Sequence, residues 1–586
     1  MNIVVVVGVI ITLLTGLPVL LQLRRHPKGL FILFFAEMWE RFSYYGMRGL
    51  LIFYLTQHFL FDDRDAQGQY AAYTTLVYLM PLVGGMLADR WLGNRKAIAF
   101  GALLLVAGHL TMAIEAKPAV QVLSFGGQSY DFRAEGRQSD RTVCLKVGEG
   151  CYQVTANAAG DMEIKGLPTT AGLPSVLPKA EYTLSVKDRS PVGVNIYYLA
   201  LSLIVLGVGY LKASISAIVG QLYPQGDIRR DPGFTLYYYG INLGAFWAAV
   251  MCGLLGQKFG WGAGFGLAGV GMLAGFIVFV RGKPLLEGHG EPPNPERLKQ
   301  KVLGLLTFEH AIYAASLLGL PLIFFLVRQY AVMGWVQLLG WIGVFGYLGW
   351  YMATKLVREE RHRLILAMIL VLASVVFWTL FEQAGSSLNQ FAERNTLLPN
   401  NGFWTVTPSQ TQSFNSAFIL IFAPVFAALW VALGKRNQDP NPVVKFGLAL
   451  VQVGLGFFIL VWGASFHDAE FRTPMIFLAL AYLLHTTGEL CLSPVGLSQM
   501  TKLAPPALIS FVMAVWFLAS SAAQFLGGVI ARFTATETVA GQVLNPEKAL
   551  ATYVETFQVI GTGGIVIGLL MLAASPWLKK LSHGAP

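Results

Sequence analysis

A charged stripe interrupts an otherwise apolar stretch near the start of the chain. The segment EMWERFSYYGMR, residues 37–48, lies between FILFFA and GLLIFYL. A helix turns about 100° per residue, and it would place on one face Glu37, Glu40, Arg41, Tyr44 and Arg48, with Tyr45 at the edge of that face. A charged side chain at mid-bilayer costs roughly 2.5–3.5 kcal/mol. The stripe therefore predicts a site that faces the protein interior, and an interfacial helix end is disfavoured by the apolar residues on both sides.

Other apolar stretches carry single polar residues that could complete this site. Lys212 lies in VLGVGYLKASISAIVG, Glu382 in FWTLFEQAGSS and Glu489 in HTTGELCLSPVG, and two further stretches contain Asn242 and Asn415. The four carboxylates are Glu37, Glu40, Glu382 and Glu489, against the three cations Arg41, Arg48 and Lys212. Pairing leaves one carboxylate over, and burial raises the pKa of an unpaired carboxylate, so we expect a site that can take up a proton.

A cavity with both fixed cations and carboxylates suits a zwitterion. Its carboxylate would contact Arg41 and Lys212, and its ammonium group would contact Glu489 and the two asparagines. The aromatic residues that could line the cavity are Tyr44, Tyr45, Tyr78, Trp378 and Trp516. Each of these rings taken alone is more often a packing residue. His109 and His485 also lie in apolar stretches, where a packed histidine is commoner than a proton relay.

The composition is that of a membrane protein. Of 586 residues, 55% are hydrophobic and 13% are charged, whereas soluble domains carry about 25% charged residues. The net charge of +10 comes from short basic clusters between apolar stretches, the pattern of cytoplasmic loops, so nucleic acid is not an expected partner. The four cysteines show no CxxC or Cys/His spacing, so we expect no metal site and no cofactor other than protons as the coupling ion.

Apolar runs of about 20 residues predict fourteen spans, at 28–58, 70–88, 97–115, 195–222, 235–256, 262–281, 308–328, 334–355, 363–388, 412–433, 444–465, 473–499, 508–531 and 551–575. Residues 1–23 predict a fifteenth helix, with a short interfacial segment or a misplaced start codon as alternatives. Alternate threading puts most basic loops, including the 282–307 linker, on one side, which we expect to be cytoplasmic.

The segment 116–194 differs from the rest because it is polar. Alternating pieces such as SYDFR, TVCLKV, CYQVT and DMEIKG are separated by Gly, Asn and Pro, which predicts a small β-rich insert on the extracytoplasmic side. Cys144 and Cys151 flank KVGEG, and a disulfide across this tight loop is plausible in an oxidising compartment.

Two sets of motifs resemble known families. GGMLADRWLGNRK, residues 84–96, is similar to the loop between the second and third helices of the major facilitator superfamily. EMWERFSYYGMR, YYYGINLGAFWA, FWTLFEQAGSSL, SFNSAFILIFAPVF and TTGELCLSPVGLSQMTKLAP resemble the proton-dependent oligopeptide transporter (POT/PTR) family of that superfamily. The likeness runs from about His26 to Trp577, apart from the insert.

The resemblance implies an all-α membrane protein with the major facilitator fold. It would have six-helix bundles at 24–281 and 357–586, two additional helices at 308–356, the extra helix at 1–23 and the β-rich insert at 116–194. Two features depart from the family pattern. The usual Asn-Pro of the eighth helix is Asn415-Ser416, and the 1–23 helix and the insert have no counterpart in the common pattern.

The resemblance also implies roles for the site residues. Proton coupling would involve Glu37, Glu40, Arg41, Lys212 and Glu382, and a gating salt bridge would join Arg48 to Glu382. The peptide-binding residues would be Arg41, Tyr44, Tyr45, Tyr78, Lys212, Asn242, Trp378, Asn415, Glu489 and Trp516. The cytoplasmic loop motif comprises Asp89, Arg90, Gly93, Arg95 and Lys96, and in the family it helps to hold the bundles together and release them.

Several functions compete for this sequence. The first hypothesis is a proton-coupled symporter that imports di- and tripeptides across a bacterial inner membrane, working as a monomer in the lipid bilayer. The second is a related carrier of nitrate or another small anion, which would have less need of Glu489 and the ExxER pair. A membrane-embedded hydrolase or a sensor is disfavoured, because the sequence shows no HExxH, no GxSxG with usable partners and no cytoplasmic signalling domain.

Overall fold

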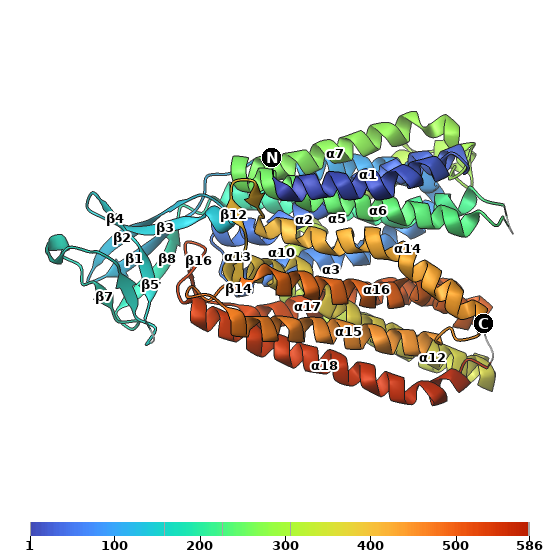
Figure 1. The fold of residues 1–586 in the computed structure, drawn as a ribbon. Helices are drawn as coiled ribbons and strands as arrows, with labels where there is room; N and C mark the ends of the chain where they lie inside the picture. Colours follow the sequence, from blue (N-terminus) through green and yellow to red (C-terminus); the bar gives the residue numbers. More distant parts are fainter. Residues whose placement is uncertain (1, 158, 225–226, 305, 584–586) are drawn as a thin grey trace.

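The chain forms long, nearly parallel helices with a β-rich segment projecting from one end (Figure 1). The computed structural model describes residues 2–157, 159–224, 227–304 and 306–583. We call the end that carries the β-rich segment the insert end. The opposite end, where the connection 282–307 lies, is called the linker end.

The helices fall into two halves. The N-terminal half contains α2 (Lys28–Phe53) with the π-turn η1 (Tyr54–His58), α3 (Asp63–Leu87) with η2 (Ala88–Leu92), α4 (Asn94–Met112), α5 (Pro191–Gln221), α6 (Arg230–Phe259) and α7 (Trp261–Arg281). The C-terminal half contains α12 (Arg358–Phe381), η6 (Glu382–Gly385), α13 (Ser387–Arg394), η7 (Pro408–Gln412), α14 (Ser413–Lys435), α15 (Pro442–Gly463), η8 (Ala464–Phe466), α16 (Met475–Leu503), η9 (Pro506–Leu508), α17 (Ile509–Ala531), η10 (Arg532–Thr534) and α18 (Pro546–Lys580). Each half has its own large apolar core.

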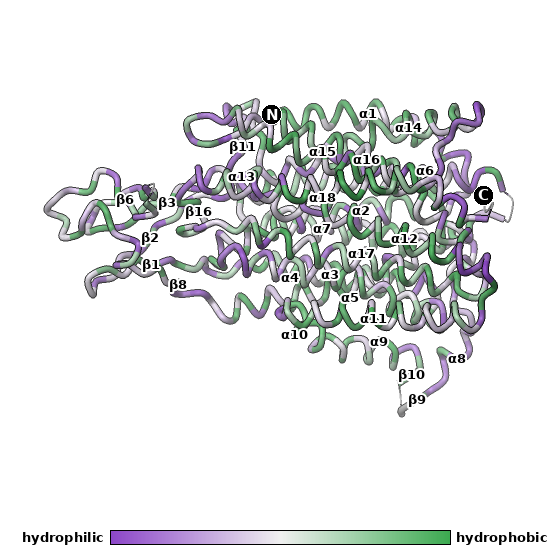
Figure 2. The backbone as a smooth tube through the Cα atoms, turned by 90° about the horizontal axis from the view of Figure 1, so that it is seen from below, coloured by the Kyte–Doolittle hydropathy of each residue, from purple (hydrophilic) through white to green (hydrophobic). Residues whose placement is uncertain are grey.

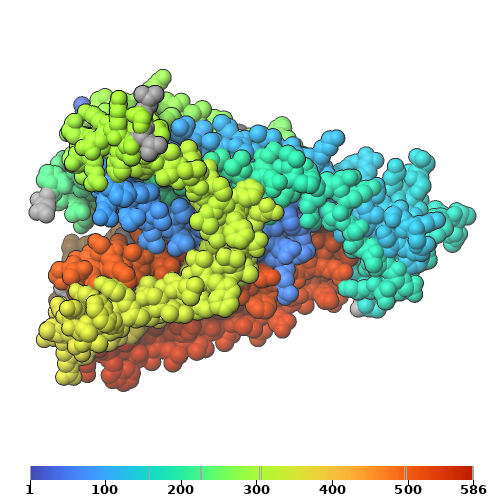
Figure 3. All heavy atoms as spheres, turned by 180° about the vertical axis from the view of Figure 1, so that it is seen from behind, coloured from blue at the N-terminus to red at the C-terminus, as the bar shows by residue number. Residues whose placement is uncertain are grey.

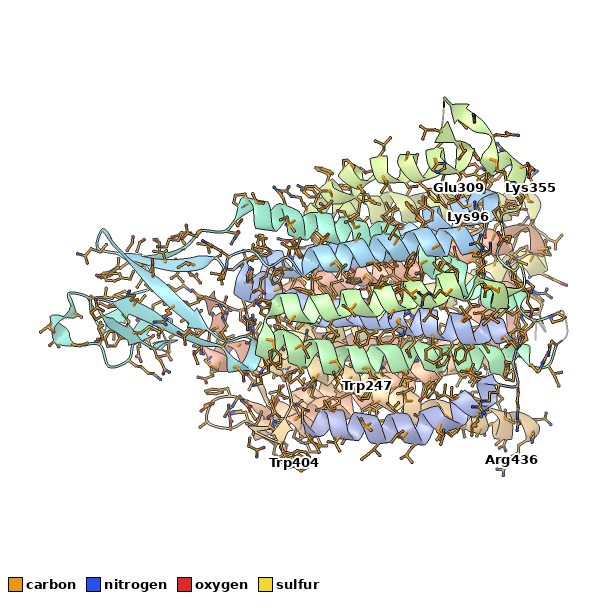
Figure 4. All side chains as sticks on the ribbon, turned by 90° about the horizontal axis from the view of Figure 1, so that it is seen from above. Lys96, Trp247, Glu309, Lys355, Trp404 and Arg436 are labelled. Carbon is orange, nitrogen blue, oxygen red and sulfur yellow. A yellow bond between two sulfur atoms is a disulfide. The ribbon has the colours of Figure 1, made fainter. Side chains whose placement is uncertain are left out.

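The remaining helices lie outside these halves. The connection between the halves carries η5 (Lys283–Leu286), α8 (Pro295–Lys299), α9 (Phe308–Leu318), α10 (Leu320–Arg328) and α11 (Tyr330–Lys355). Figure 3 shows these connecting helices as a band across the two halves. The predicted N-terminal helix is present as α1 (Ile3–Leu23), which packs against α6 and α14. Trp247 of α6 donates a 3.0 Å hydrogen bond to Thr12 of α1, and Figure 4 shows this tryptophan beside that helix.

The predicted helical membrane fold is confirmed. In the described residues, fourteen helices, α1 among them, are long and apolar enough to cross a membrane. Figure 2 shows apolar residues along the helices and polar residues at both ends and in the insert. The helix α2 is not among the fourteen, because its central charges lower its hydropathy, although most of its residues are buried between its neighbours.

Several helices extend beyond the predicted spans. The helix α3 begins at Asp63 rather than residue 70, and the Asp62 side chain caps it by accepting a hydrogen bond from the Asp65 N–H. The helix pair α12–α13 reaches Arg394 rather than residue 388. Hydropathy falls at the polar residues of a helix end, whereas backbone hydrogen bonding continues to the cap.

Close packing within a half depends on small residues. A Cβ on Gly101 of α4 would lie 2.6 Å from the carbonyl oxygen of Gly207 on α5. Glycine at this position lets the two backbones touch, which is how helices in membranes gain packing energy without a hydrophobic driving force.

The insert folds as two antiparallel sheets. The five-stranded sheet has the order β4-β3-β2-β1-β8, and the three-stranded sheet has the order β5-β6-β7. The strands are β1 (Val120–Phe125), β2 (Gln128–Glu135), β3 (Thr142–Val147), β4 (Gly150–Tyr152), β5 (Val154–Ala156), β6 (Met162–Ile164), β7 (Val176–Leu177) and β8 (Tyr182–Lys187), with the short helices η3 (Gln138–Asp140) and η4 (Thr169–Ala171). Residues 191–194, which the prediction included in the insert, belong to α5.

A disulfide joins Cys144 of β3 to Cys151 of β4, whose Cα atoms are 5.4 Å apart. Short strand pairs occur elsewhere: β9 (Lys301–Leu303) with β10 (Leu306–Thr307), β11 (Thr396–Leu397) with β14 (Thr473–Pro474), β12 (Asn400–Asn401) with β13 (Trp404–Thr405), and β15 (Thr538–Val539) with β16 (Gln542–Val543). The last three pairs lie at the insert end.

Candidate functional site

A cavity of about 360 Å³ lies between the two halves. From the N-terminal half it is lined mainly by Arg41, Tyr45, Arg48, Tyr78, Lys212, Tyr238 and Asn242. From the C-terminal half it is lined mainly by Trp378, Glu382, Asn415, Glu489 and Trp516. Figure 3 shows a hollow between the halves at the linker end. Most of the predicted site residues, spread over more than 470 positions of sequence, therefore meet at one cavity.

The stripe on α2 places a cation at the cavity and two carboxylates behind it. Arg41 Nε donates a 2.8 Å hydrogen bond to Glu37 Oε1, and the same nitrogen lies 3.2 Å from Glu40 Oε2. Both glutamates are only 1% exposed, and neither lines the cavity. Within the described residues, neither oxygen of Glu40 accepts a hydrogen bond. One guanidinium thus balances two buried carboxylates, and Glu40 is the less satisfied of the two.

Arg48 links the two halves on the side of the cavity that faces the insert end. Its guanidinium forms an ion pair with Glu382 and donates a 2.6 Å hydrogen bond to the hydroxyl of Tyr70. Glu382 begins the 3₁₀ turn η6, where α12 stops before α13 starts. A Cβ on Gly385 of this turn would lie 2.6 Å from Arg48 Nε and would clash with the Tyr70 hydroxyl. The glycine therefore allows α2 to approach the break in α12.

Two opposite charges in the cavity wall have no ionic partner among the described residues: Lys212 and Glu489. The Lys212 ammonium nitrogen lies 3.4 Å from the centre of the Tyr78 ring, a cation–π contact. Glu489 accepts hydrogen bonds from Asn415 Nδ2 at 3.1 Å and from the Tyr238 hydroxyl at 3.3 Å. Arg41 pairs with both Glu37 and Glu40, and Arg48 pairs with Glu382. Among the described residues, Glu489 is therefore the cavity carboxylate without an ionic partner, and Lys212 is the cavity cation without one.

The structure corrects the prediction for one aromatic residue. Both Tyr44 and Tyr45 are expected from the sequence to line the cavity, with Tyr45 at the edge of the charged face, but the cavity lining includes Tyr45 and not Tyr44. Tyr44 is buried within the N-terminal core, and its hydroxyl lacks a hydrogen-bond partner among the described residues. Helical periodicity gives the angle between the two tyrosines, but the position of α3 and the C-terminal half decides which of them meets the cavity.

The buried histidines do not contribute to the cavity. His485 Nε2 lies 3.1 Å from the carbonyl oxygen of Val453, and neither His485 nor His109 belongs to the cavity lining. Both are fully enclosed by packed side chains. This placement agrees with the expectation that each is a packing residue.

Sequence reasoning missed a second ion pair between the halves. Arg394 of α13 donates to both carboxylate oxygens of Asp63 at the start of α3, at 2.5 and 2.8 Å. Gln67 of α3 donates a 2.6 Å hydrogen bond to Gln390 of α13 beside this pair. Both charged residues lie outside the predicted spans, where single charges are ordinary, and only their complementary signs in adjacent helix ends could have suggested the pair. Tyr238, which contacts Glu489, was also missed.

The loop motif packs on the linker and on the start of α9. Gly93 has a φ of +75°, and a Cβ there would lie 2.5 Å from Pro292 N. Arg95 Nε donates a 2.7 Å hydrogen bond to Glu291, and this guanidinium lowers the pKa of the Glu291 carboxyl. Lys96 pairs with Glu309 of α9, as Figure 4 shows. Asp89 and Arg90 lie in the adjoining turn η2.

Comparison with known proteins identifies the family. Residues 95–546 match the family described as "PTR2: POT family". The chain belongs to the POT family. This family lies within the major facilitator superfamily, and its members are membrane transporters rather than enzymes.

Several relatives cover nearly the whole chain. The uncharacterized transporter YclF of Bacillus subtilis is 32% identical over 95% of this chain and 96% of its own length. A di-/tripeptide transporter of Lactococcus lactis subsp. cremoris is 30% identical, with the same coverage of both chains. A crystal structure of a peptide transporter named POT, in complex with alafosfalin, superposes with a TM-score of 0.70 at 33% identity, covering 95% of this chain and 96% of that one.

The hydrogen bonds that join the halves of this POT protein gather toward the insert end. Besides the two ion pairs, Asn389 of α13 donates to the Gly49 carbonyl at 3.0 Å, and Gln410 of η7 donates to the Val250 carbonyl of α6 at 3.2 Å. The hollow between the halves lies at the opposite end (Figure 3). The structure is therefore closed at the insert end and open toward the linker end.

Proposed function

We propose that the protein is a proton-coupled symporter that imports di- and tripeptides by alternating access. The observation that carries this proposal is the pair of uncompensated charges in one cavity, Lys212 on one wall and Glu489 on the other. A peptide with free termini has a carboxylate and an ammonium group at its two ends, and it would satisfy both charges at once. The printed function of the Lactococcus relative supports the same substrate class.

The basic side of the cavity would hold the peptide carboxylate. Arg41 and Lys212 both line the cavity, and a charge-assisted hydrogen bond to a carboxylate contributes roughly 1.5–3 kcal/mol. On the other side, Glu489 with Asn415 and Asn242 would hold the ammonium group. The rings of Tyr45, Tyr78, Trp378 and Trp516 would contact the peptide side chains.

The two carboxylates behind Arg41 would carry the proton. Because a single guanidinium serves both Glu37 and Glu40, one negative charge in this buried group is left uncompensated. A proton on Glu40 would remove that charge and free Arg41 to bind the peptide carboxylate. Lys212 and Glu382 would take part in the same charge rearrangement, since each lines the cavity beside Arg41.

The two ends of the transporter would open in turn. The Arg48–Glu382 and Asp63–Arg394 pairs would form the gate at the insert end, because each joins the two halves there. At the linker end, the loop motif would govern how the N-terminal half moves against the linker. Both halves of the cavity come from one chain, so a single copy would suffice in the bilayer.

The sidedness follows from the distribution of charge. The basic loops, including the 282–307 linker, would face the cytoplasm, as the positive-inside rule requires. The insert with its disulfide would face the outside of a bacterial inner membrane, where oxidation is favoured. The domains would then be 1–23, 24–281 with the insert, 282–307, 308–356 and 357–586.

The test is uptake of labelled dialanine by proteoliposomes, with and without an inward proton gradient. We expect gradient-driven accumulation by the wild type, and Glu40→Gln should abolish accumulation while retaining exchange of peptide for peptide. Glu547→Gln, at the first turn of α18, is the matched control and should accumulate dialanine as the wild type does. Absence of uptake and exchange of every di- and tripeptide by folded protein, with transport of nitrate instead, would overturn the proposal.

A further inference from the structure

The insert is attached to one half of the transporter but shares its core with both. Its polypeptide leaves α4 and returns into α5, so both covalent connections are to the N-terminal half. Its apolar core nevertheless includes Val539, Ala540 and Leu544, which lie in and beside the β15–β16 hairpin of the C-terminal half. An insert that moved independently of the C-terminal half would not need side chains from that half to complete its apolar core.

A short turn of the insert, residues 138–141, contacts both halves. The backbone N–H of Gln138 donates a 2.8 Å hydrogen bond to Gln57 Oε1 of the N-terminal half. The side-chain oxygen of the same Gln138 accepts hydrogen bonds from the N–H and hydroxyl of Ser409 in the C-terminal half, at 3.2 and 2.8 Å. Gln138 is 1% exposed and has a φ of +50°, a backbone conformation that a non-glycine residue rarely adopts.

Asp140 and Arg141 of the same turn also contact both halves. Arg141 donates through Nη2 to the Gln57 carbonyl at 2.9 Å and through Nε to the Ala540 carbonyl at 2.7 Å. The Asp140 carboxylate lies 2.6 Å from the ammonium nitrogen of Lys258 in α6, and it accepts a 3.4 Å hydrogen bond from Asn400 in β12. Thus Gln138, Asp140 and Arg141 each join the N-terminal half to the C-terminal half.

Further contacts with the C-terminal half lie beyond the turn. The N–H of Ala156 in β5 donates a 3.0 Å hydrogen bond to the Leu544 carbonyl. Lys179 forms a 2.6 Å ion pair with Glu537. These contacts extend over the insert, so the turn is part of a wider interface with the hairpin.

We propose that the insert is a strap that holds the insert end closed, with the turn 138–141 as its fastening point. This proposal rests on the alternating access of the proposed function. When the halves separate at this end, the insert would move with the N-terminal half to which it is tethered. Its bonds to Ser409, Asn400, Ala540 and Leu544 would then have to break. The strap thereby lowers the population of the outward-open state and slows its formation.

The test measures outward opening without any substrate. A reporter cysteine, Gln524→Cys, is placed in the cavity lining, and intact cells are treated with a membrane-impermeant maleimide. The reagent reaches the reporter only when the insert end opens. The chain without the reporter is the blank, because Cys252 and Cys491 are buried and the other two cysteines form the disulfide.

Two variants remove strap contacts from opposite sides. Arg141→Met alters the insert, whereas Asn400→Ala leaves the insert sequence intact and removes a side-chain bond to Asp140 of the insert, so a misfolded insert cannot explain an effect of the second. We expect Arg141→Met to raise the labelling rate by about tenfold or more, since it removes hydrogen bonds of a charged donor. Asn400→Ala should raise the rate about twofold, since it removes one long hydrogen bond to a carboxylate. The control Lys187→Met removes an ion pair with Asp131 inside the insert and should leave the rate unchanged.

Three results would overturn the strap: unchanged labelling in both variants, an equal rise in the control, or no labelling of the reporter in any form. The proposed function fails separately, through the dialanine assay. Faster labelling of the two variants in a protein that does not carry peptides would leave the strap standing, and peptide transport with unchanged labelling would remove the strap alone.

Discussion

The substitution Glu489→Gln tests how the cavity recognises its substrate. Glutamine keeps the shape of the side chain and a carbonyl oxygen that can accept from Asn415 and Tyr238, which lie 3.1 and 3.3 Å from the glutamate. It removes only the negative charge. The proposed ammonium partner would therefore lose a charge-assisted hydrogen bond while the cavity wall stays in place.

The size of the effect follows from the burial of this group. Glu489 is 7% exposed and has no cationic partner among the described residues, so little solvent screens its interaction with an ammonium group. A hydrogen bond to a charged group contributes roughly 1.5–3 kcal/mol, which corresponds to a loss of affinity of about 10- to 150-fold. We expect a loss in this range for dialanine.

The assay compares peptides that lack one terminal charge. Dialanine, N-acetyl-dialanine and dialanine amide compete with labelled dialanine for uptake into proteoliposomes. Glu489→Gln should weaken dialanine and dialanine amide by similar factors and leave N-acetyl-dialanine nearly unchanged, since this peptide has no ammonium group. The matched variant Lys212→Gln should show the mirror pattern, with the amide as the insensitive peptide. Equal losses for all three peptides in Glu489→Gln would refute the assignment of this residue to the ammonium group.

Two further substitutions probe the contacts between the halves. Gly385→Ala should displace the Arg48 guanidinium from Glu382, because the new Cβ would lie 2.6 Å from Arg48 Nε, and we expect dialanine uptake to fall at least tenfold. The control Gly343→Ala, where the structure leaves open space for a Cβ, should retain uptake. Full activity of Gly385→Ala would contradict the role of the turn. Arg394→Met leaves Asp63 buried without its cation, a change that costs about 3–5 kcal/mol, so the thermal unfolding midpoint in detergent should drop clearly. The double variant Asp63→Asn/Arg394→Met should recover part of that loss, and strictly additive losses would show that the pair contributes no coupling.

The local chemistry of the chain accounts for most of the fold prediction. Apolar runs identified the helices, including α1, and the alternating polar pieces identified the β-rich insert, with TVCLKV coinciding with β3. The charged stripe on α2 was recognised because four charges in an apolar run are expensive in a bilayer. These signals depend on residues close together in the sequence, which a single chain displays without alignment or structure.

The ends of helices and the second ion pair were harder to predict. Asp63 and Arg394 are separated by 331 positions and lie where hydropathy no longer marks a span. Their pairing requires the start of α3 and the end of α13 to lie side by side at the same depth in the membrane. Hydropathy gives neither quantity, so the pair becomes visible only when the halves are placed against each other.

The sequence by itself determined the inventory of charges in the membrane and the helices that carry them. The imbalance of four carboxylates against three cations was already apparent, but which carboxylate stays unpaired was not. Arg41 takes both Glu37 and Glu40, which leaves Glu489 and Lys212 without ionic partners among the described residues. Tertiary structure alone decided this, because an ion pair depends on the distance between atoms on separate helices. The same reason applies to Tyr44 and Tyr45, and to an insert that is tethered to one half while its turn 138–141 contacts both.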